Sequence, residues 1–177
     1  MESGFHFEQV LDKFKEKKSK LPKIIANVIQ THFKESFVNQ GFNESGSIDK
    51  WQEVQRREQN GGEGKFKYNY RIRGSKSGSG GYSKGKSTAD RTNPILQGKG
   101  SGKLSKSIQV TKATWEVIEV ATVGDVVNKY AAVHNFGERA GRGKGFQMPK
   151  RMFIGDSENM FKKIDAEIEK NIDAIFK

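Results

Sequence analysis

The first forty residues carry apolar positions at the spacing of α-helices. Between residues 5 and 20, apolar side chains are mixed with charged ones in a pattern that predicts a helix. Pro22 then suits the first position of a second helix, where its missing N–H costs little. After it, one apolar face recurs every three to five residues and comprises Ile24, Ile25, Val28, Ile29, His32, Phe33 and Phe37. This spacing predicts a helix over residues 22–40 that ends near Gly41.

The centre of the chain changes to a period of two residues. Residues 43–64 are polar, with Trp51 and Val54 as apolar anchors, and predict a short helix or an irregular link. Over residues 65–73, aromatic and apolar residues alternate with Lys, Arg and Asn, which predicts a strand with one wet face.

The pattern is then lost in a low-complexity segment. Residues 74–103 consist mainly of Gly, Ser and Lys, and cannot bury enough apolar area to offset their ordering entropy. We therefore expect a single domain over residues 1–177, with a flexible basic insertion at about 74–100.

Two strands and a helix are predicted next. Apolar members of the runs 107–112 and 115–122 indicate a hairpin. Asp125 can cap a helix that Gly137 closes. We expect the apolar face of that helix to consist of Val126, Val127, Tyr130 and Val133.

The C-terminal forty residues begin with a basic, glycine-rich loop over residues 138–147. Residues 152–154 then predict a short apolar strand. Asp156 or Ser157 can cap a last helix. Its predicted apolar face consists of Phe161, Ile164, Ile168, Ile172 and Ile175. Together the elements predict an α+β fold: a long N-terminal helix, a small antiparallel sheet, a short internal helix, and a C-terminal helix packed on the sheet.

Charge is concentrated in two regions. The net charge is +11, and residues 60–106 hold eleven Lys or Arg against two acids, while residues 137–151 hold five against one. We expect contacts with phosphate or with an acidic partner from Lys65, Lys67, Arg71, Arg73, Lys84, Lys86, Arg139, Arg142 and Lys144. Nucleic-acid binding, docking on an acidic protein and simple solubility all remain open interpretations of this charge.

Several classes of protein are disfavoured by composition. The chain has no cysteine, which excludes disulfides and thiolate metal sites. No apolar run approaches the roughly 18 residues of a membrane span, and the first ten residues do not resemble a signal peptide. We expect no contact with a membrane.

Residues 80–87 match the phosphate-binding pattern G-x-x-x-x-G-K-[ST]. That chemistry needs a buried strand before the loop and a helix after it. Gly, Ser and Lys precede the match, and residues 88–94 carry no helical apolar face. We interpret the match as a product of composition and expect no nucleotide site.

Histidine provides no catalytic or metal cluster either. His134 has no carboxylate at ligand spacing, and His6 and His32 lie on other predicted helices. A packed structural histidine is the simpler interpretation of His134. We predict no catalytic residue, no metal and no cofactor, and hence no enzyme.

Three blocks follow one another in a fixed order: Gly102–Ile108, Tyr130–Gly137 and Met148–Gly155. Their order and context, over residues 102–177, resemble the phage virion morphogenesis family. That family includes the tail-completion proteins of Mu-like and P2-like phages and has distant relatives among neck proteins. Within the blocks, Leu104 and Ile108 stand at i,i+4, which predicts one docked helical turn. Residues at the helix end near Gly137 are placed to fix the next loop, and Arg151 is expected to pair across a subunit boundary. The signature residues are Leu104, Ile108, Tyr130, His134, Phe136, Gly137, Met148, Pro149, Arg151 and Phe153.

The resemblance also implies a function. Such a protein is a structural subunit of the virion, is assembled in the host cytoplasm, and forms a ring, expected as a hexamer, that completes the tail at its head-proximal end. Its expected partners are copies of itself, tail-tube proteins and neck or connector proteins, with non-specific contact to packaged DNA. A neck protein on the portal side and a basic nucleic-acid-binding module are the alternatives.

Overall fold

The computed structural model describes residues 7–53, 94–97, 102–141 and 143–176. Apart from Glu53, these residues belong to one compact unit formed by Met1–Gln52 and Pro94–Lys177. The unit contains α1 (Phe7–Asn39), β1 (Gly41–Asn43), β2 (Ile48–Lys50), α2 (Lys103–Ser107), β3 (Ile108–Ala113), β4 (Ile118–Thr122), α3 (Asp125–Phe136), β5 (Arg139–Ala140), β6 (Phe146–Gln147) and α4 (Glu158–Phe176). The α+β class is confirmed. The predicted strand at 65–73 lies outside the described residues, as do the phosphate-loop match and most of the predicted insertion.

Helix α1 is continuous through Pro22, so the predicted break between two helices is wrong. A proline inside a helix removes one backbone hydrogen bond. Leu21 and Pro22 are both buried at this point, so tertiary packing stabilises the helix where the local sequence opposes it.

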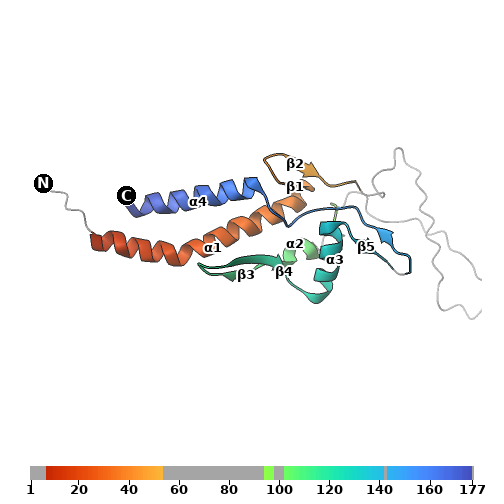
Figure 1. Ribbon diagram of the computed structural model, residues 1–177, viewed down its shortest axis with the longest axis horizontal. Coiled ribbons are helices and arrows are strands. Elements are labelled where there is room, and N and C mark those ends of the chain that lie inside the picture. The colour runs from red at the N-terminus through yellow and green to blue at the C-terminus, as the bar shows by residue number, and fades with distance from the viewer. Residues whose placement is uncertain (1–6, 54–93, 98–101, 142, 177) are drawn as a thin grey trace, which may run out of the picture. The chain divides into compact units, whose positions relative to one another are not determined.

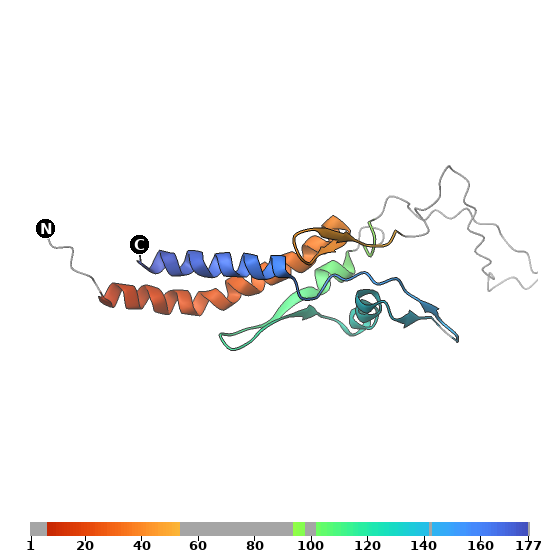
Figure 2. The same cartoon turned by 45° about the horizontal axis from the view of Figure 1, so that its top comes forward.

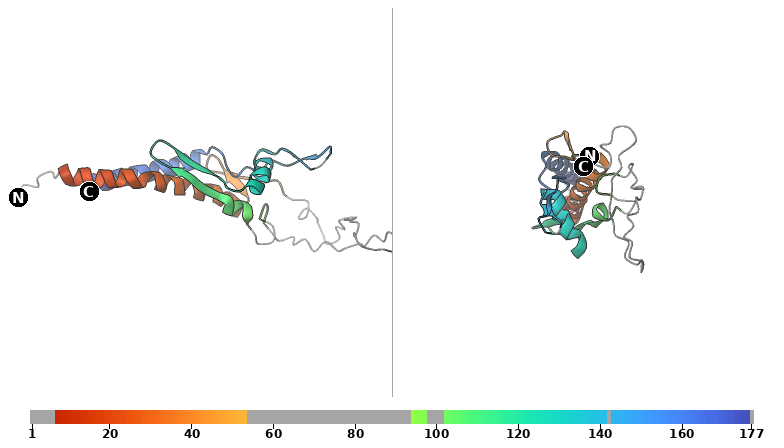
Figure 3. Two further views of the ribbon diagram at one scale, coloured as in Figure 1. Left: turned by 90° about the horizontal axis from the view of Figure 1, so that it is seen from below. Right: turned by 90° about the vertical axis from the view of Figure 1, so that its right-hand side faces the viewer.

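Helix α1 lies between the other large elements of the unit. Helix α4 packs along one side of α1 and the β3–β4 hairpin packs along another (Figures 1 and 2). The sequence placed the C-terminal helix on the sheet, whereas in the structure it packs against α1. The start of α1 and the end of α4 lie at the same end of this unit (Figure 3).

The end of α1 leads directly into a small hairpin. Gln40 adopts a left-handed conformation with φ 52°, which was expected of Gly41. Gly41 instead begins β1, where a Cβ atom would lie 2.4 Å from the carbonyl oxygen of Asp49. Strands β1 and β2 pair antiparallel from Gly41↔Lys50 to Asn43↔Ile48. The predicted helix or irregular link is therefore wrong at this point.

The predicted hairpin is confirmed in β3 and β4. They pair antiparallel from Ile108↔Thr122 to Ala113↔Ile118, with an irregularity between Val110 and Lys112. The single turn of α2 precedes β3, as Leu104 and Ile108 predicted. Helix α3 follows, but its buried residues are Ala131 and Asn135 rather than the predicted apolar face.

Two short segments differ from their predictions. Strands β5 and β6 pair inside the predicted loop at 138–147. Residues 152–154 form no regular strand. Their backbone is instead bound by the side chains described below, which replace the hydrogen bonds of a neighbouring strand.

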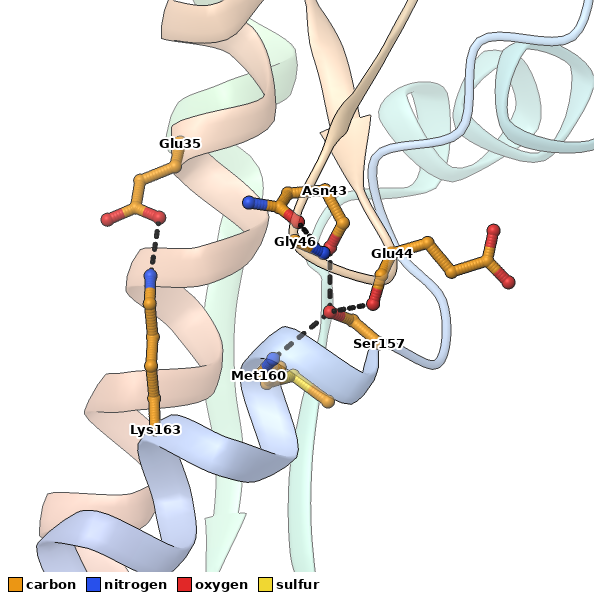
Figure 4. Close-up of polar contacts among 7 residues, drawn as sticks. All are labelled: Glu35, Asn43, Glu44, Gly46, Ser157, Met160 and Lys163. Atoms are coloured by element: carbon orange, nitrogen blue, oxygen red, sulfur yellow. Dashed lines mark hydrogen bonds and ion pairs between the residues drawn. The ribbon is translucent and has the colours of Figure 1, made fainter.

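Ser157 caps α4 and also binds the β1–β2 turn (Figure 4). Its Oγ accepts a hydrogen bond from the Met160 N–H at 3.0 Å. The same hydroxyl lies 2.7 Å from the carbonyl oxygen of Asn43, to which it donates. The Lys163 ammonium lies 3.0 Å from the Glu35 carboxylate, one turn further along α4. The start of α4 is thus fixed to both α1 and the β1–β2 hairpin.

Candidate functional site

Asn135 joins the second and third sequence blocks. It lies at the C-terminal end of α3 and is buried. Its Oδ1 accepts hydrogen bonds from the N–H groups of Phe153 at 2.9 Å and Ile154 at 3.0 Å, and its Nδ2 donates to the Ile154 carbonyl at 2.9 Å. One side-chain amide therefore satisfies three buried or part-buried backbone groups.

The backbone after α3 approaches the third block closely. Gly137 closes α3 in a left-handed conformation with φ 71°, as predicted. A Cβ atom there would lie 2.9 Å from the Lys150 nitrogen, so the position needs glycine for space as well as for conformation. The Arg151 N–H donates to the His134 carbonyl at 2.7 Å.

Arg151 and Trp51 extend this junction to the β1–β2 hairpin. The Arg151 guanidinium donates to the Gln52 carbonyl through Nε at 3.3 Å and Nη2 at 3.2 Å. The Trp51 indole donates to the Met152 carbonyl at 2.7 Å. Arg151 is only 5% exposed, so within the chain its guanidinium is held against the Gln52 carbonyl.

An aromatic core lies beneath the junction. Phe37 packs edge-on against Trp51, with ring centroids 5.4 Å apart, and lies 5.2 Å from Phe153. Leu104, Ile108 and Phe153 are buried. Tyr130, His134, Met148 and Pro149 are half-buried. Among the signature residues Phe136 differs, because it is 66% exposed. The blocks therefore build mainly a scaffold, and Phe136 is the large apolar member that faces outward.

His32 is buried and His134 is half-buried, and the Nδ1 atom of His134 is buried without a hydrogen-bond partner. Burial, and then the charge of Arg151, lowers the pKa of His134. Burial, and then the charge of Lys163, lowers the pKa of His32. Both rings are therefore neutral at pH 7. Within the described residues, no group of three or more His, Asp or Glu side chains is placed to hold a metal ion.

Sequence reasoning missed the residues that join the blocks. Asn135, Trp51 and Ser157 each bind backbone groups of a segment distant in the sequence. Asn and Ser near helix ends are a local signal for capping. The sequence contains no local signal for the segment that Asn135 or Trp51 would bind.

A basic turn joins strands β5 and β6. The Arg139 guanidinium donates to the Lys144 carbonyl and closes the turn. Arg139 and Lys144 are both exposed, and they line an open hollow of about 420 Å³ with Ala140, Gly141, Gly143 and Gly145. Of the predicted phosphate or acidic-partner contacts, these two are brought together. Lys65, Lys67, Arg71, Arg73, Lys84, Lys86 and Arg142 lie outside the described residues.

Large apolar side chains are exposed at several places on the unit. They include Phe7, Leu11 and Phe14 on α1, Trp115 at the β3–β4 turn, and Phe161, Ile172 and Phe176 on α4. Exposed apolar surface that is grouped on one element commonly marks an interaction site. In the part of the chain that the structure describes, no helix is long and apolar enough to span a membrane.

The sequence model of the phage virion morphogenesis family matches residues 74–173. The match includes all three blocks and continues through most of α4. No curated protein and no solved structure matches the chain significantly.

Proposed function

The chain belongs to the phage virion morphogenesis family, and from this premise we propose that it forms a ring that completes or terminates the tail at its head-proximal end. The family itself assigns a structural or assembly role in the phage virion. The ring and its position are the finer part of the proposal. A ring joins the tail to the head by presenting one face to tail-tube proteins and the other to neck proteins.

The observation that carries the proposal is the grouping of exposed apolar side chains on the long helices. Phe7 is 65% exposed, Phe161 is 50% exposed and Phe176 is 70% exposed. Burying apolar surface stabilises an interface by about 25 cal/mol per Å². A subunit with aromatic side chains on two helices has the surface that contacts with neighbouring subunits require.

The basic β5–β6 turn supports a second contact within the same function. Arg139 and Lys144 present positive charge beside an open hollow. We propose that this turn meets an acidic neighbour or the phosphates of DNA that passes through the ring.

Ring formation is tested by native mass spectrometry and negative-stain electron microscopy of the purified full chain. We expect a closed hexamer. A twelvefold ring would instead favour the portal-side alternative. A chain that stays monomeric at all concentrations, alone and with tail-tube protein, would contradict the ring.

The position of the ring is tested in a phage that lacks the gene. We expect heads and tails to accumulate unjoined and to join when the purified protein is added. Particles that assemble and infect normally without the gene would refute a role in head–tail joining.

A further inference from the structure

Helix α1 carries a 4-3 apolar pattern that continues past the elements that cover it. Positions 7, 11, 14, 18, 21, 25, 28 and 32 follow this spacing and are apolar except for Lys18 and His32. Such positions share one face of a helix. Leu21 and His32 are buried, whereas Phe7, Leu11 and Phe14 are 65%, 38% and 49% exposed. We name these three residues the α1 stripe.

Both neighbours of α1 stop where the stripe begins. Lys17 donates to Asn171 in the last turns of α4 at 3.3 Å. The Lys18 ammonium lies 5.8 Å from the centre of the Trp115 ring at the β3–β4 turn. The start of α1 extends beyond the end of α4 and beyond the turn of the hairpin (Figures 1 to 3). The stripe is therefore the part of the apolar face that neither α4 nor the hairpin covers.

Helix α4 exposes a second apolar surface. Its Met160, Asn171 and Ile175 are buried. Phe161, Ile172 and Phe176 flank that buried face and are 50%, 46% and 70% exposed. We name these three residues the α4 flank. Helix α4 thus has a wider apolar arc than α1 of the same chain covers.

We infer that the α1 stripe of one subunit packs on the α4 flank of the next subunit in the ring. The inference rests on the proposed ring and adds the surface through which it forms. Within one chain, α1 already packs on α4. The contact between subunits would repeat that pairing with the uncovered part of α1 and the uncovered face of α4.

Charge complementarity favours α4 of a second copy as the partner of the α1 stripe. Residues 7–20 hold five lysines against three acids, a net charge of +2. Helix α4 holds five acids against three lysines, a net charge of −2. Asp165 lies between Phe161 and Ile168 at helical spacing, on the face of α4 that carries the flank. Pairing two α1 stripes would instead bring like charges together.

The geometry of such a contact agrees with a ring. The stripe and the flank are different surfaces, so their contact is heterologous. Heterologous contacts produce closed rings when the rotation between subunits closes, whereas contacts between identical surfaces produce dimers.

Cross-linking between two single-cysteine proteins tests the contact directly, because the chain has no cysteine of its own. Leu11→Cys protein is mixed with Ile172→Cys protein, exchanged through the dissociated state and mildly oxidised. A disulfide forms only when the two Cα atoms come within about 7 Å. We expect the mixed disulfide dimer to form severalfold faster than in the matched mixture of Val38→Cys with Ile172→Cys. Val38 is on the same helix and is 81% exposed.

The outcomes separate this contact from the ring itself. A ring seen by native mass spectrometry, with Leu11–Ile172 dimers no more abundant than the Val38 control, would leave the ring standing and overturn the contact. Faster formation of Leu11–Leu11 dimers would show that two α1 stripes pair and would also overturn it. A persistent monomer without cross-links would refute the ring and the contact together.

Discussion

The two halves of α1 have the same kind of apolar face but different surroundings. Between Leu21 and Asn39 the face is covered, and Phe33 and Phe37 are 5% and 1% exposed. Between Phe7 and Phe14 the same spacing of apolar residues continues, but Phe7, Leu11 and Phe14 are 65%, 38% and 49% exposed. An apolar face on a helix therefore predicts that something covers it, and the rest of the fold decides whether the cover comes from the same chain.

The two halves of α1 also differ in the interactions that stabilise the helix. Most helical stability in proteins comes from tertiary packing, and isolated short helices are marginal. The buried residues of α1 all lie in its second half, from Leu21 to Phe37. The first half has ion pairs along its own surface, such as Lys20 with Glu16 at 2.6 Å. We expect it to gain its main packing only in the assembled particle.

Truncating one phenylalanine in each half should give the largest contrast. Phe37→Ala removes a buried ring that packs on Trp51 and Phe153, and should lower the free energy of unfolding by about 3–5 kcal/mol. Phe14→Ala removes a half-exposed ring and should change it by about 0.5 kcal/mol or less. Urea denaturation at a concentration where subunits are dissociated measures both, and equal losses would show that the first half is packed within its own chain.

Removing the Asn135 amide should give a smaller loss of stability. Asn135 binds the backbone of Phe153, whose ring packs on Phe37 in the covered half of α1. Asn135→Ala leaves two N–H groups and one carbonyl without their partner and should lower the free energy of unfolding by about 2–3 kcal/mol. Lys129→Ala, at an exposed position of the same helix, is the control and should cost about 0.5 kcal/mol or less. Equal effects of the two substitutions would argue against Asn135 as the residue that joins the blocks.

Acidification should lower the free energy of unfolding by the smallest amount of the three changes, through His32 in the covered half of α1. Burial, and then the charge of Lys163, holds the pKa of His32 below 6.5, while Glu35 opposes the shift. The unfolded chain therefore binds a proton more readily, so the contribution of His32 is fully present above pH 6.5 and is lost as pH falls toward the folded pKa. One such group gives a slope of at most about 1.4 kcal/mol per pH unit.

Thermal unfolding between pH 5 and 8 measures this slope in the wild type and in His32→Leu. We expect the substitution to reduce the slope below pH 6.5 and to leave the portion that comes from His134, whose pKa is also lowered by burial. A slope that does not change in His32→Leu would mean that His32 gains its proton equally well in both states.

Local patterns predicted the elements whose order is set by nearby residues. The helical spacing of α1 and α4, the alternation in the β3–β4 hairpin and the left-handed glycine at position 137 were all visible in the sequence. So was the order of the three blocks that identifies the family. In each case the physical cause lies within a few residues of the feature.

Only the tertiary structure decided the rest. Helix α1 continues through Pro22 because buried neighbours stabilise it there. Residues 152–154 form no strand because Asn135 and Trp51, distant in the sequence, bind their backbone. The sequence by itself determined that the first twenty residues carry an apolar face. That this face extends beyond both α4 and the hairpin depends on where those elements end in space, and no local spacing records that.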